Sequence, residues 1–465
     1  MTHASFEAIC KHCAFAHGAH SRRRAKAADG RTVTTDNKVF AKAAWRLIPF
    51  MVLLYVVAYL DRVNVGFAAL TMNKDLALDA TMFGWAGGIF FLGYFVFEVP
   101  SNVILERVGA RLWICRIMLT WGAVSMATAF ANSLASLLIL RFLLGVAEAG
   151  FFPGMVLFLT YWFPQATRAR FIALFLAAVP LANVVGAPAS GYILGLEGVL
   201  HLHGWQWMFV LEGAPSVLLG LAVLVLLPDR PAKAAWLTDE EKAVMETALA
   251  AEPPREHTDL WPMLRDPRIW LLTIPDFGIV LGLYGLNLWL PQIVKAMGFT
   301  NVETGFVVSG LYLVSVVAMV LWGMSSDRRQ ERIGHIAGAA LLGAAGFIAA
   351  AVLQHAPVAE LIALTIASIG VYAALSVFWT LPTSFLGGTA AAAGIALINS
   401  FSNLGGFVGP YMMGWLKHLT GDYAAGMGVL AGGMILAAVL VVAIGRTLTF
   451  AGRAHALEKY TRLNA

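Results

Sequence analysis

The sequence predicts an all-α polytopic membrane protein with twelve transmembrane helices in two six-helix bundles. First, 59% of its 465 residues are hydrophobic and only 13% are charged, whereas a soluble domain carries about 25% charged residues. Second, the apolar residues form runs of about 20, the length that crosses a ~30 Å hydrocarbon core. Third, a polar stretch in the middle of the chain separates six runs from six. With only three cysteines, a disulfide-scaffold protein is excluded.

The twelve runs are rich in Leu, Ala, Val and Gly, and they lack the alternating pattern of membrane β-strands. Gly and Pro within them are compatible with spans, because neighbouring helices can satisfy a broken backbone. We expect spans at about residues 45–68, 82–104, 112–132, 135–160, 169–195, 206–227, 269–294, 304–324, 333–354, 358–382, 390–416 and 424–446.

The basic residues predict the orientation. Lys and Arg are concentrated in the two tails and in every second loop, whereas the opposite loops contain only Lys74, Lys295 and Lys417. The positive-inside rule therefore predicts that both termini are cytoplasmic, in a bacterial-type inner membrane. The net charge of +5 follows from this topology and gives no reason to expect a nucleic-acid partner.

The spans and the polar stretches divide the chain into five segments. A short surface helix is expected in the central loop, because Thr238 and Glu241 have the spacing of a capping box. The predicted segments are a disordered cytoplasmic tail (1–43), an N-terminal six-helix bundle (44–227), a cytoplasmic central loop (228–266), a C-terminal six-helix bundle (267–447) and a cytoplasmic tail (448–465).

The N-terminal tail contains Cys10, Cys13, His17 and His20, at spacings that suit a tetrahedral zinc site. No apolar residues surround them to build a small domain, so we expect an accidental cluster and neither a metal nor a cofactor. A natural start downstream of the cluster is an open alternative. Whether the cluster binds metal stays open. Cys115 lies within a span and is expected to be a small core residue.

Two loops carry a repeated motif. An acid followed by Arg ends the second span of each half, as Glu106-Arg107 with Arg111 in the first half and as Asp327-Arg328 in the second. Charge pairs there can hold neighbouring helix ends together. A two-fold repeat with matched loops is typical of a carrier whose site lies between the halves, near the midplane of the membrane.

These loops resemble the acid-Arg-x-Gly-x-Arg motif of the major facilitator superfamily, although the first copy carries Glu106 where Asp is usual. Longer stretches resemble the anion:cation symporter family within it, over about residues 44–450. They are Tyr59-Leu60-Asp61-Arg62-Val63-Asn64, Glu98-Val99-Pro100-Ser101-Asn102, Arg141 through Pro153, Trp205-Gln206-Trp207, Leu211-Glu212-Gly213, Trp289-Leu290-Pro291-Gln292, Asn403-Leu404-Gly405-Gly406 and Gly409-Pro410.

The resemblance implies twelve helices and proton-coupled uptake of a small organic anion by alternating access. Tartrate-like hydroxy acids, sugar acids and aromatic carboxylates such as phthalate or hydroxyphenylacetate are the substrates that it implies. The expected partners are therefore a small carboxylate, protons and the lipid bilayer, and a monomer is the expected oligomeric state. The sequence does not choose among these acids, nor does it give the proton stoichiometry.

Ionisable residues within spans are few, and each costs at least about 2.5–3.5 kcal/mol at the bilayer centre, so each should have a function or a partner. At ~1.5 Å per residue, Asp61 and Arg141 lie at a similar outer level, with Glu148 about 10 Å deeper as a lone acid. The set is Asp61, Arg62, Glu98, Arg116, Arg141, Glu148 and Asp276.

We expect Arg62 or Arg141 to hold the substrate carboxylate, because guanidinium binds carboxylate through two parallel hydrogen bonds. Asp61 and Glu148 are expected to take up and release protons. The resemblance implies the same four roles and adds the Tyr94 hydroxyl in the cavity. The alternative is a structural network in which Asp61 pairs with Arg141 and holds span 1 to span 4.

The other charges are expected near the cytoplasmic ends of the spans. Glu98 and Arg116, with Glu106 and Arg107 nearby, are predicted to form a structural or gating cluster. Asp276 follows Pro275 near the start of span 7, and its role stays open, with substrate choice as one possibility.

The C-terminal half supplies neutral polar groups. Trp packs against rings and sugar faces, and Asn bonds hydroxyls. The alternative is that these groups only join helices to one another, as polar residues often do in membranes. The candidates for substrate binding are Asn287, Trp379, Asn399 and Asn403.

Three other functions compete with symport. A proton-coupled drug or solute antiporter is the nearest, because Gly186-Ala187-Pro188-Ala189-Ser190-Gly191 partly matches an antiporter signature. A non-transporting sensor of the same fold is the second. A membrane-embedded enzyme is not expected, because every His lies in a tail, a loop or a span end and no known catalytic motif stands where it could work.

Overall fold

The computed structural model describes residues 30–164, 168, 171, 178–251, 264–385 and 389–463. The cysteine–histidine cluster lies outside these residues, as does much of the predicted N-terminal tail. Within them the chain is built from helices joined by short turns, as the composition predicts.

The N-terminal half consists of seven described helices. The fourth span is made of two of them, because the helix is interrupted at Ala149 and Gly150. Gly150 has φ +86°, a left-handed conformation that glycine adopts without steric cost. The helices are α2 (Gly30–Asp75), α3 (Ala80–Val108), α4 (Ala110–Thr128), α5 (Leu134–Glu148), α6 (Phe151–Trp162), α8 (Ala178–Ile193) and α9 (Gly204–Leu226).

The C-terminal half repeats this plan. Its fifth span is also divided, here between Ser402 and Gly405. The helices are α12 (Pro267–Ala296), α13 (Asn301–Arg329), α14 (Ile333–Val352), α15 (Pro357–Phe378), α16 (Thr380–Phe385), α17 (Thr389–Ser402), α18 (Gly405–Thr420) and α19 (Ala424–Leu463).

Nine of the helical segments in the described part of the chain are long and apolar enough to cross a membrane on their own. The other three spans are α4, α8 and the α17–α18 pair, which are shorter, divided or next to undescribed residues. The twelve-helix architecture of the prediction is therefore confirmed.

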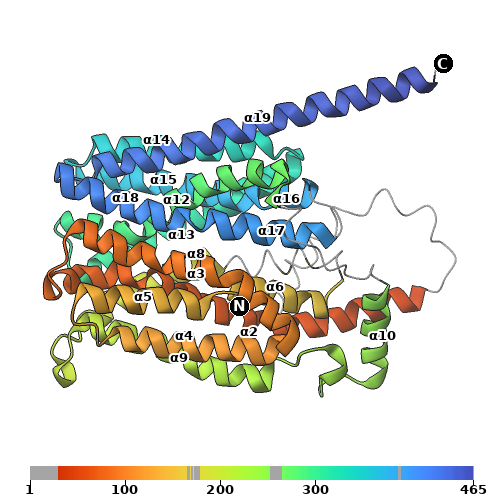
Figure 1. Cartoon of the computed structure of the whole chain (residues 1–465), viewed down its shortest axis with the longest axis horizontal. Coiled ribbons are helices and arrows are strands. Elements are labelled where there is room, and N and C mark those ends of the chain that lie inside the picture. Colours follow the sequence, from red (N-terminus) through yellow and green to blue (C-terminus); the bar gives the residue numbers. More distant parts are fainter. Residues whose placement is uncertain are drawn as a thin grey trace.

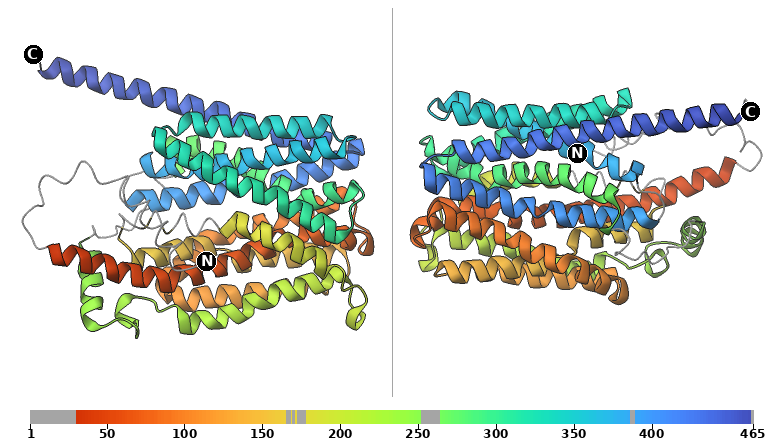
Figure 2. Two further views of the ribbon diagram at one scale, coloured as in Figure 1. Left: turned by 180° about the vertical axis from the view of Figure 1, so that it is seen from behind. Right: turned by 45° about the horizontal axis from the view of Figure 1, so that its top comes forward.

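The two halves lie side by side, with α2 to α9 on one side and α12 to α19 on the other (Figure 1). The main helix pairs that join them are α3 with α18, α8 with α13 and α2 with α12, and α3 also contacts α17. The two further views show the same division into halves (Figure 2).

One end of the interface between the halves is closed by glycines that pack directly against backbone. We call it the sealed end. A Cβ on Gly305 of α13 would lie 2.5 Å from the Ala187 carbonyl oxygen of α8, and one on Gly84 of α3 would lie 2.7 Å from that of Pro410 on α18. Such approaches are open only to glycine, so at these two points the helix backbones meet without an intervening side chain.

The central loop packs on the N-terminal half. Thr238 caps α10 (Asp239–Ala250) in the predicted capping box with Glu241. The Lys42 ammonium lies 2.7 Å from a Glu241 carboxylate oxygen, and the Trp236 ring stacks on Trp162 with centroids 5.6 Å apart. Figure 1 places α10 beside the start of α2.

Two helices extend beyond the predicted spans. Helix α2 begins at Gly30, inside the segment expected to be disordered, and α19 continues to Leu463, through the predicted C-terminal tail. The first α2 turns with described side chains gain a partner in α10 through Lys42. Helix α19 projects beyond the bundle (Figures 1 and 2).

Candidate functional site

A cavity of about 70 Å³ lies between the two halves. Seven helices line it, and its wall combines aromatic rings with a few polar groups. The lining residues are Tyr55, Tyr59, Arg62, Tyr94, Phe152, Val179, Asp276, Val280, Leu283, Tyr284, Leu375, Trp379, Asn399 and Asn403.

Arg62 is the cation of this wall. Its guanidinium forms an ion pair with Glu148 of α5 and donates a hydrogen bond of 3.0 Å to the Tyr284 hydroxyl of α12. It also lies over the rings of Phe90 and Tyr94, at 5.4 and 5.2 Å from their centroids. One side chain therefore joins both halves at the cavity.

The expectation that Glu148 is a lone acid is wrong. Glu148 is fully buried and pairs with Arg62 through one carboxylate oxygen, while its other oxygen has no hydrogen-bond partner among the described residues. The membrane depth of each Cα did not predict this pair, because the long side chain of Arg62 places its guanidinium at a different depth from its own Cα.

Asp61 is held by neutral donors. The Ser125 and Ser216 hydroxyls donate to it at 2.8 and 3.2 Å, and the Asn64 amide does so at 3.3 Å. The alternative in which Asp61 pairs directly with Arg141 is therefore not what the structure contains. Asp61 does not line the cavity, since it points toward α4 and α9.

Arg141 is buried without a carboxylate partner. Its Nε donates to the Ala86 carbonyl at 3.3 Å, and neither terminal nitrogen has a hydrogen-bond partner in the described part of the chain. The face that it shares with Gly145 packs on α3, where a Cβ on Gly145 would lie 2.0 Å from the Phe90 carbonyl oxygen. The room beside this glycine is thus filled by a helix.

The wall from the C-terminal half contains three of the four predicted residues: Trp379, Asn399 and Asn403. Asn287 does not line the cavity. Its amide nitrogen donates to the Tyr59 hydroxyl at 3.2 Å, and its amide oxygen accepts from Tyr312 at 2.6 Å. Asn287 thus joins the halves through a buried polar network.

The predicted gating cluster is not assembled. Glu98 is fully buried and accepts hydrogen bonds from Asn399, at 3.0 Å, and from Ser400. Arg116 instead lies over the Trp113 ring, 4.0 Å from its centroid, and donates to the Ala147 carbonyl at 3.4 Å. Glu98 faces the opposite half because α3 packs against α17, a contact that no span-by-span argument contains.

The two motif loops differ in their partners. Glu106 and Arg107 are exposed, while the Arg111 amide donates to Asp229 at 3.1 Å. In the second half, Asp327 pairs with Arg332 at 2.6 Å, and Arg328 is exposed. In this motif Asp327 therefore pairs with Arg332 and not with the adjacent Arg328.

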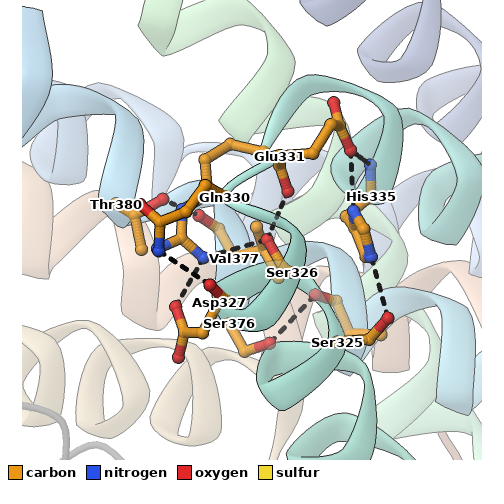
Figure 3. Close-up of polar contacts among 11 residues, drawn as sticks. Ser325, Ser326, Asp327, Gln330, Glu331, His335, Ser376, Val377 and Thr380 are labelled. Carbon is orange, nitrogen blue, oxygen red and sulfur yellow. Dashed lines mark hydrogen bonds and ion pairs between the residues drawn. The ribbon is translucent and has the colours of Figure 1, made fainter. Parts of the chain in front are cut away.

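The turn from α13 to α14 contains a chain of contacts among Ser325, His335 and Glu331 (Figure 3). His335 lies 2.7 Å from Glu331 and 3.2 Å from the Ser325 hydroxyl. The same carboxylate accepts from the Gly334 and His335 amides. The carboxylate therefore caps the start of α14, and the contacts fasten α13 to it.

Sequence reasoning missed several lining residues, most clearly Tyr55, Tyr59 and Phe152. Helical spacing could have found some of them. Tyr55, Tyr59 and Arg62 stand at i, i+4 and i+7, the spacing of one helix face. The position of Arg62 therefore identifies the helix face on which Tyr55 and Tyr59 also lie.

Two pseudo-symmetric bundles around a central cavity with a buried arginine define a membrane carrier. The chain belongs to the Major Facilitator Superfamily, whose sequence profile matches residues 51–410. It is therefore a multi-pass membrane transporter.

Several relatives match nearly the whole chain. A protein of Agrobacterium vitis named "Putative tartrate transporter" is 50% identical over 420 residues, which are 89% of this chain and 93% of the relative. The "Quinolone resistance transporter" of Acinetobacter baumannii is 42% identical over 410 residues, covering 87% and 94%. The inner membrane transport protein RhmT of Escherichia coli is 38% identical over 423 residues, covering 90% and 98%.

Solved structures share the fold. A D-xylose-proton symporter superposes with a TM-score of 0.68 at 15% identity, covering 85% of this chain and 97% of its own. An inward-facing bacterial homologue of the lysosomal transporter Spinster gives 0.66 at 18% identity, covering 88% and 96%. At these identities the likeness extends to the fold alone.

Proposed function

We propose that this chain is a proton-coupled symporter that takes up a small organic anion. The observation that carries the proposal is the ion pair between Arg62, on the cavity wall, and the buried Glu148. The names of the relatives, among them a tartrate transporter, support an organic acid as substrate.

The pair couples the two ligands by competition. A substrate carboxylate that reaches the cavity binds the Arg62 guanidinium through parallel hydrogen bonds and displaces Glu148. The displaced carboxylate is buried and has lost its ion pair with Arg62, a condition that favours its protonated form. Substrate and proton therefore enter together, whereas either one alone leaves a buried charge unpaired.

Asp61 and Arg141 complete the proposed machinery behind the cavity wall. Asp61 is a second proton site, held by the hydroxyls of Ser125 and Ser216. Arg141, whose terminal nitrogens have no hydrogen-bond partner among the described residues, is on the same helix as Glu148 and provides a second cation of the N-terminal half. Because the substrate and the proton move together, a proton gradient directed into the cytoplasm drives uptake across the inner membrane.

The test is transport by the purified protein in liposomes that contain a pH-sensitive dye. Addition of an acid such as L-tartrate outside should acidify the lumen. An inward proton gradient should accelerate the uptake of that acid. Acidification that requires the substrate supports symport. An absence of flux with every organic acid offered would refute the proposal.

The second candidate is a proton-coupled antiporter, which the relative named as a quinolone resistance transporter favours. The glycines of the partial antiporter signature make packing contacts here: a Cβ on Gly191 would lie 2.7 Å from the Asn301 carbonyl oxygen. Antiport would make the lumen more alkaline when substrate enters, so the same assay separates the two mechanisms.

A further inference from the structure

Asp276 is the acid of the cavity wall that the proposed coupling does not use. Its side chain is fully buried, and neither carboxylate oxygen has a hydrogen-bond partner among the described residues. It lines the same cavity as Arg62 but comes from α12, in the opposite half. The cavity therefore has a cation on one wall and an unsatisfied acid on the other.

Ser402 lies near the Asp276 carboxyl, but its hydroxyl donates to the Thr273 carbonyl at 3.3 Å. Asn399, Trp379 and Asn403 line the same cavity, and the Asn399 amide donates to Glu98. Among the described lining residues, Arg62 is the only Lys or Arg, and it pairs with Glu148. The hydrogen bonds that Asp276 lacks therefore have to come from the ligand or from water.

A buried carboxyl without partners carries the full cost of its lost hydration. A ligand hydroxyl relieves that cost, because it can donate to the ionised carboxyl or accept from the neutral one. An unsubstituted methylene or an aromatic C–H does neither and leaves the group unsatisfied. This wall therefore distinguishes ligands by whether the carbon atom that faces Asp276 carries a hydroxyl group.

We propose that Asp276 binds a hydroxyl group of the substrate, so that the cavity selects hydroxylated carboxylic acids over acids of the same skeleton without hydroxyls. The inference rests on the proposed function, since Arg62 must hold the carboxylate for Asp276 to face the hydroxylated carbons. It narrows the substrate class to hydroxy acids and sugar acids and excludes plain aromatic acids.

The experiment measures inhibition of transport, or stabilisation against heat where no transport is seen, by two matched series. Succinate, L-malate and L-tartrate share two carboxylates and carry no, one and two hydroxyls. Hexanoate and gluconate form the second series, and benzoate is the unhydroxylated aromatic acid. For the wild type, we expect affinity to rise about tenfold with each hydroxyl that reaches Asp276.

The variants separate the contact from general damage. Asp276→Leu should flatten the ranking, whereas Asp276→Asn, which keeps a hydrogen-bonding oxygen, should preserve much of it. Ile274→Ala, at an exposed position on the same helix, is the matched control and should leave the ranking unchanged. If Asp276→Leu does not fold, the wild-type ranking still decides, together with that of Asp276→Asn.

The outcomes distinguish the two proposals. Binding of organic acids without preference for hydroxyls overturns this inference and leaves the symporter proposal standing. An unchanged ranking in Asp276→Leu has the same effect, as does a preference for aspartate over malate, which would assign Asp276 to an amine. If the wild type responds to no organic acid, the proposed function fails and this inference fails with it.

Discussion

Asp61 and Arg62 are consecutive residues whose side chains lie on different sides of α2. Asp61 accepts hydrogen bonds from Ser125 of α4 and Ser216 of α9, inside the N-terminal half. Arg62 points into the cavity between the halves and pairs with Glu148. Successive residues on a helix are rotated by about 100°, so one short motif serves both the bundle and the substrate path.

Glu148→Gln should abolish transport driven by a proton gradient and leave exchange of substrate for substrate largely intact. The amide cannot take up a proton, whereas Arg62 stays available for the substrate carboxylate. Gradient-driven uptake and counterflow, measured on the same liposomes, check this. Glu106→Gln, at an exposed acid, is the control, and gradient-driven uptake at the wild-type rate by Glu148→Gln would remove Glu148 from the coupling.

The double variant Ser125→Ala/Ser216→Ala should be less stable than the wild type. Each hydroxyl donates to the buried Asp61, and a hydrogen bond to a charged group contributes about 1.5–3 kcal/mol. Thermal unfolding in detergent should show a lower midpoint. In an Asp61→Asn background, the same two serine substitutions should lower the midpoint by less. A decrease of equal size in that background would contradict the contacts between the serines and Asp61.

Gly305→Ala should weaken the sealed end without unfolding either half. The added methyl group would lie 2.5 Å from the Ala187 carbonyl oxygen across the interface, so the conformation with this end open becomes more populated. A cysteine in place of Ser309, whose hydroxyl bonds the Val184 carbonyl at 2.6 Å, should then react severalfold faster with a hydrophilic thiol reagent.

Two other glycines give the controls for that experiment. Gly310 of α13 has no atom within 4 Å of an added Cβ, so Gly310→Ala should leave the reactivity unchanged. Gly145→Ala introduces a contact inside the N-terminal half and should lower the unfolding temperature instead. Equal reactivity in Gly305→Ala and Gly310→Ala would show that the glycine contact does not hold this end closed.

The turn before α9 should be most stable in mildly acidic solution. The hydrogen bond that His203 donates to Glu197 raises the pKa of His203 above its usual 6.5, and the bonds from the Gly204 amide and from His203 lower the pKa of Glu197 below 4.5. The histidine contribution is complete below its unfolded pKa and is lost as the pH rises through the higher folded value. The carboxylate contribution is lost as the pH falls through the lower folded value.

Hydrogen exchange of the Gly204 amide, which donates to Glu197 at 2.7 Å, checks this dependence. After correction for the intrinsic rate, protection should be greatest between about pH 4.5 and 6.5 and should decrease above pH 7. In His203→Gln the decrease above pH 7 should be absent. A pH-independent protection factor in the wild type would contradict the ion pair.

The sequence predicted which residues line the cavity better than how they are paired. Arg62, Tyr94, Trp379, Asn399 and Asn403 all line the cavity, because a polar group in a span has to face protein or water. Hydropathy also located the spans, because the thickness of the hydrocarbon core sets how long each apolar run has to be.

The pairings could not be predicted, because they depend on which helices become neighbours. Glu148 was expected to be alone, and Glu98 was expected beside Arg116. The contacts of Arg62 with α5 and of Glu98 with α17 arise from helix order and rotation in three dimensions. The breaks at Gly150 and after Ser402 also escape a hydropathy reading, which registers apolar residues whether or not the helix is continuous.

The glycines of the sealed end have a consequence for the cost of motion. At the Gly305 and Gly84 contacts, polypeptide backbone presses on backbone that is already hydrogen-bonded within its own helix. The rings of Trp85 and Tyr411 also pack across this interface, with centroids 5.2 Å apart, and Asp79 lies 3.9 Å from His418. The glycines thus set how closely the helices approach, while opening this end also costs the contacts of the neighbouring side chains.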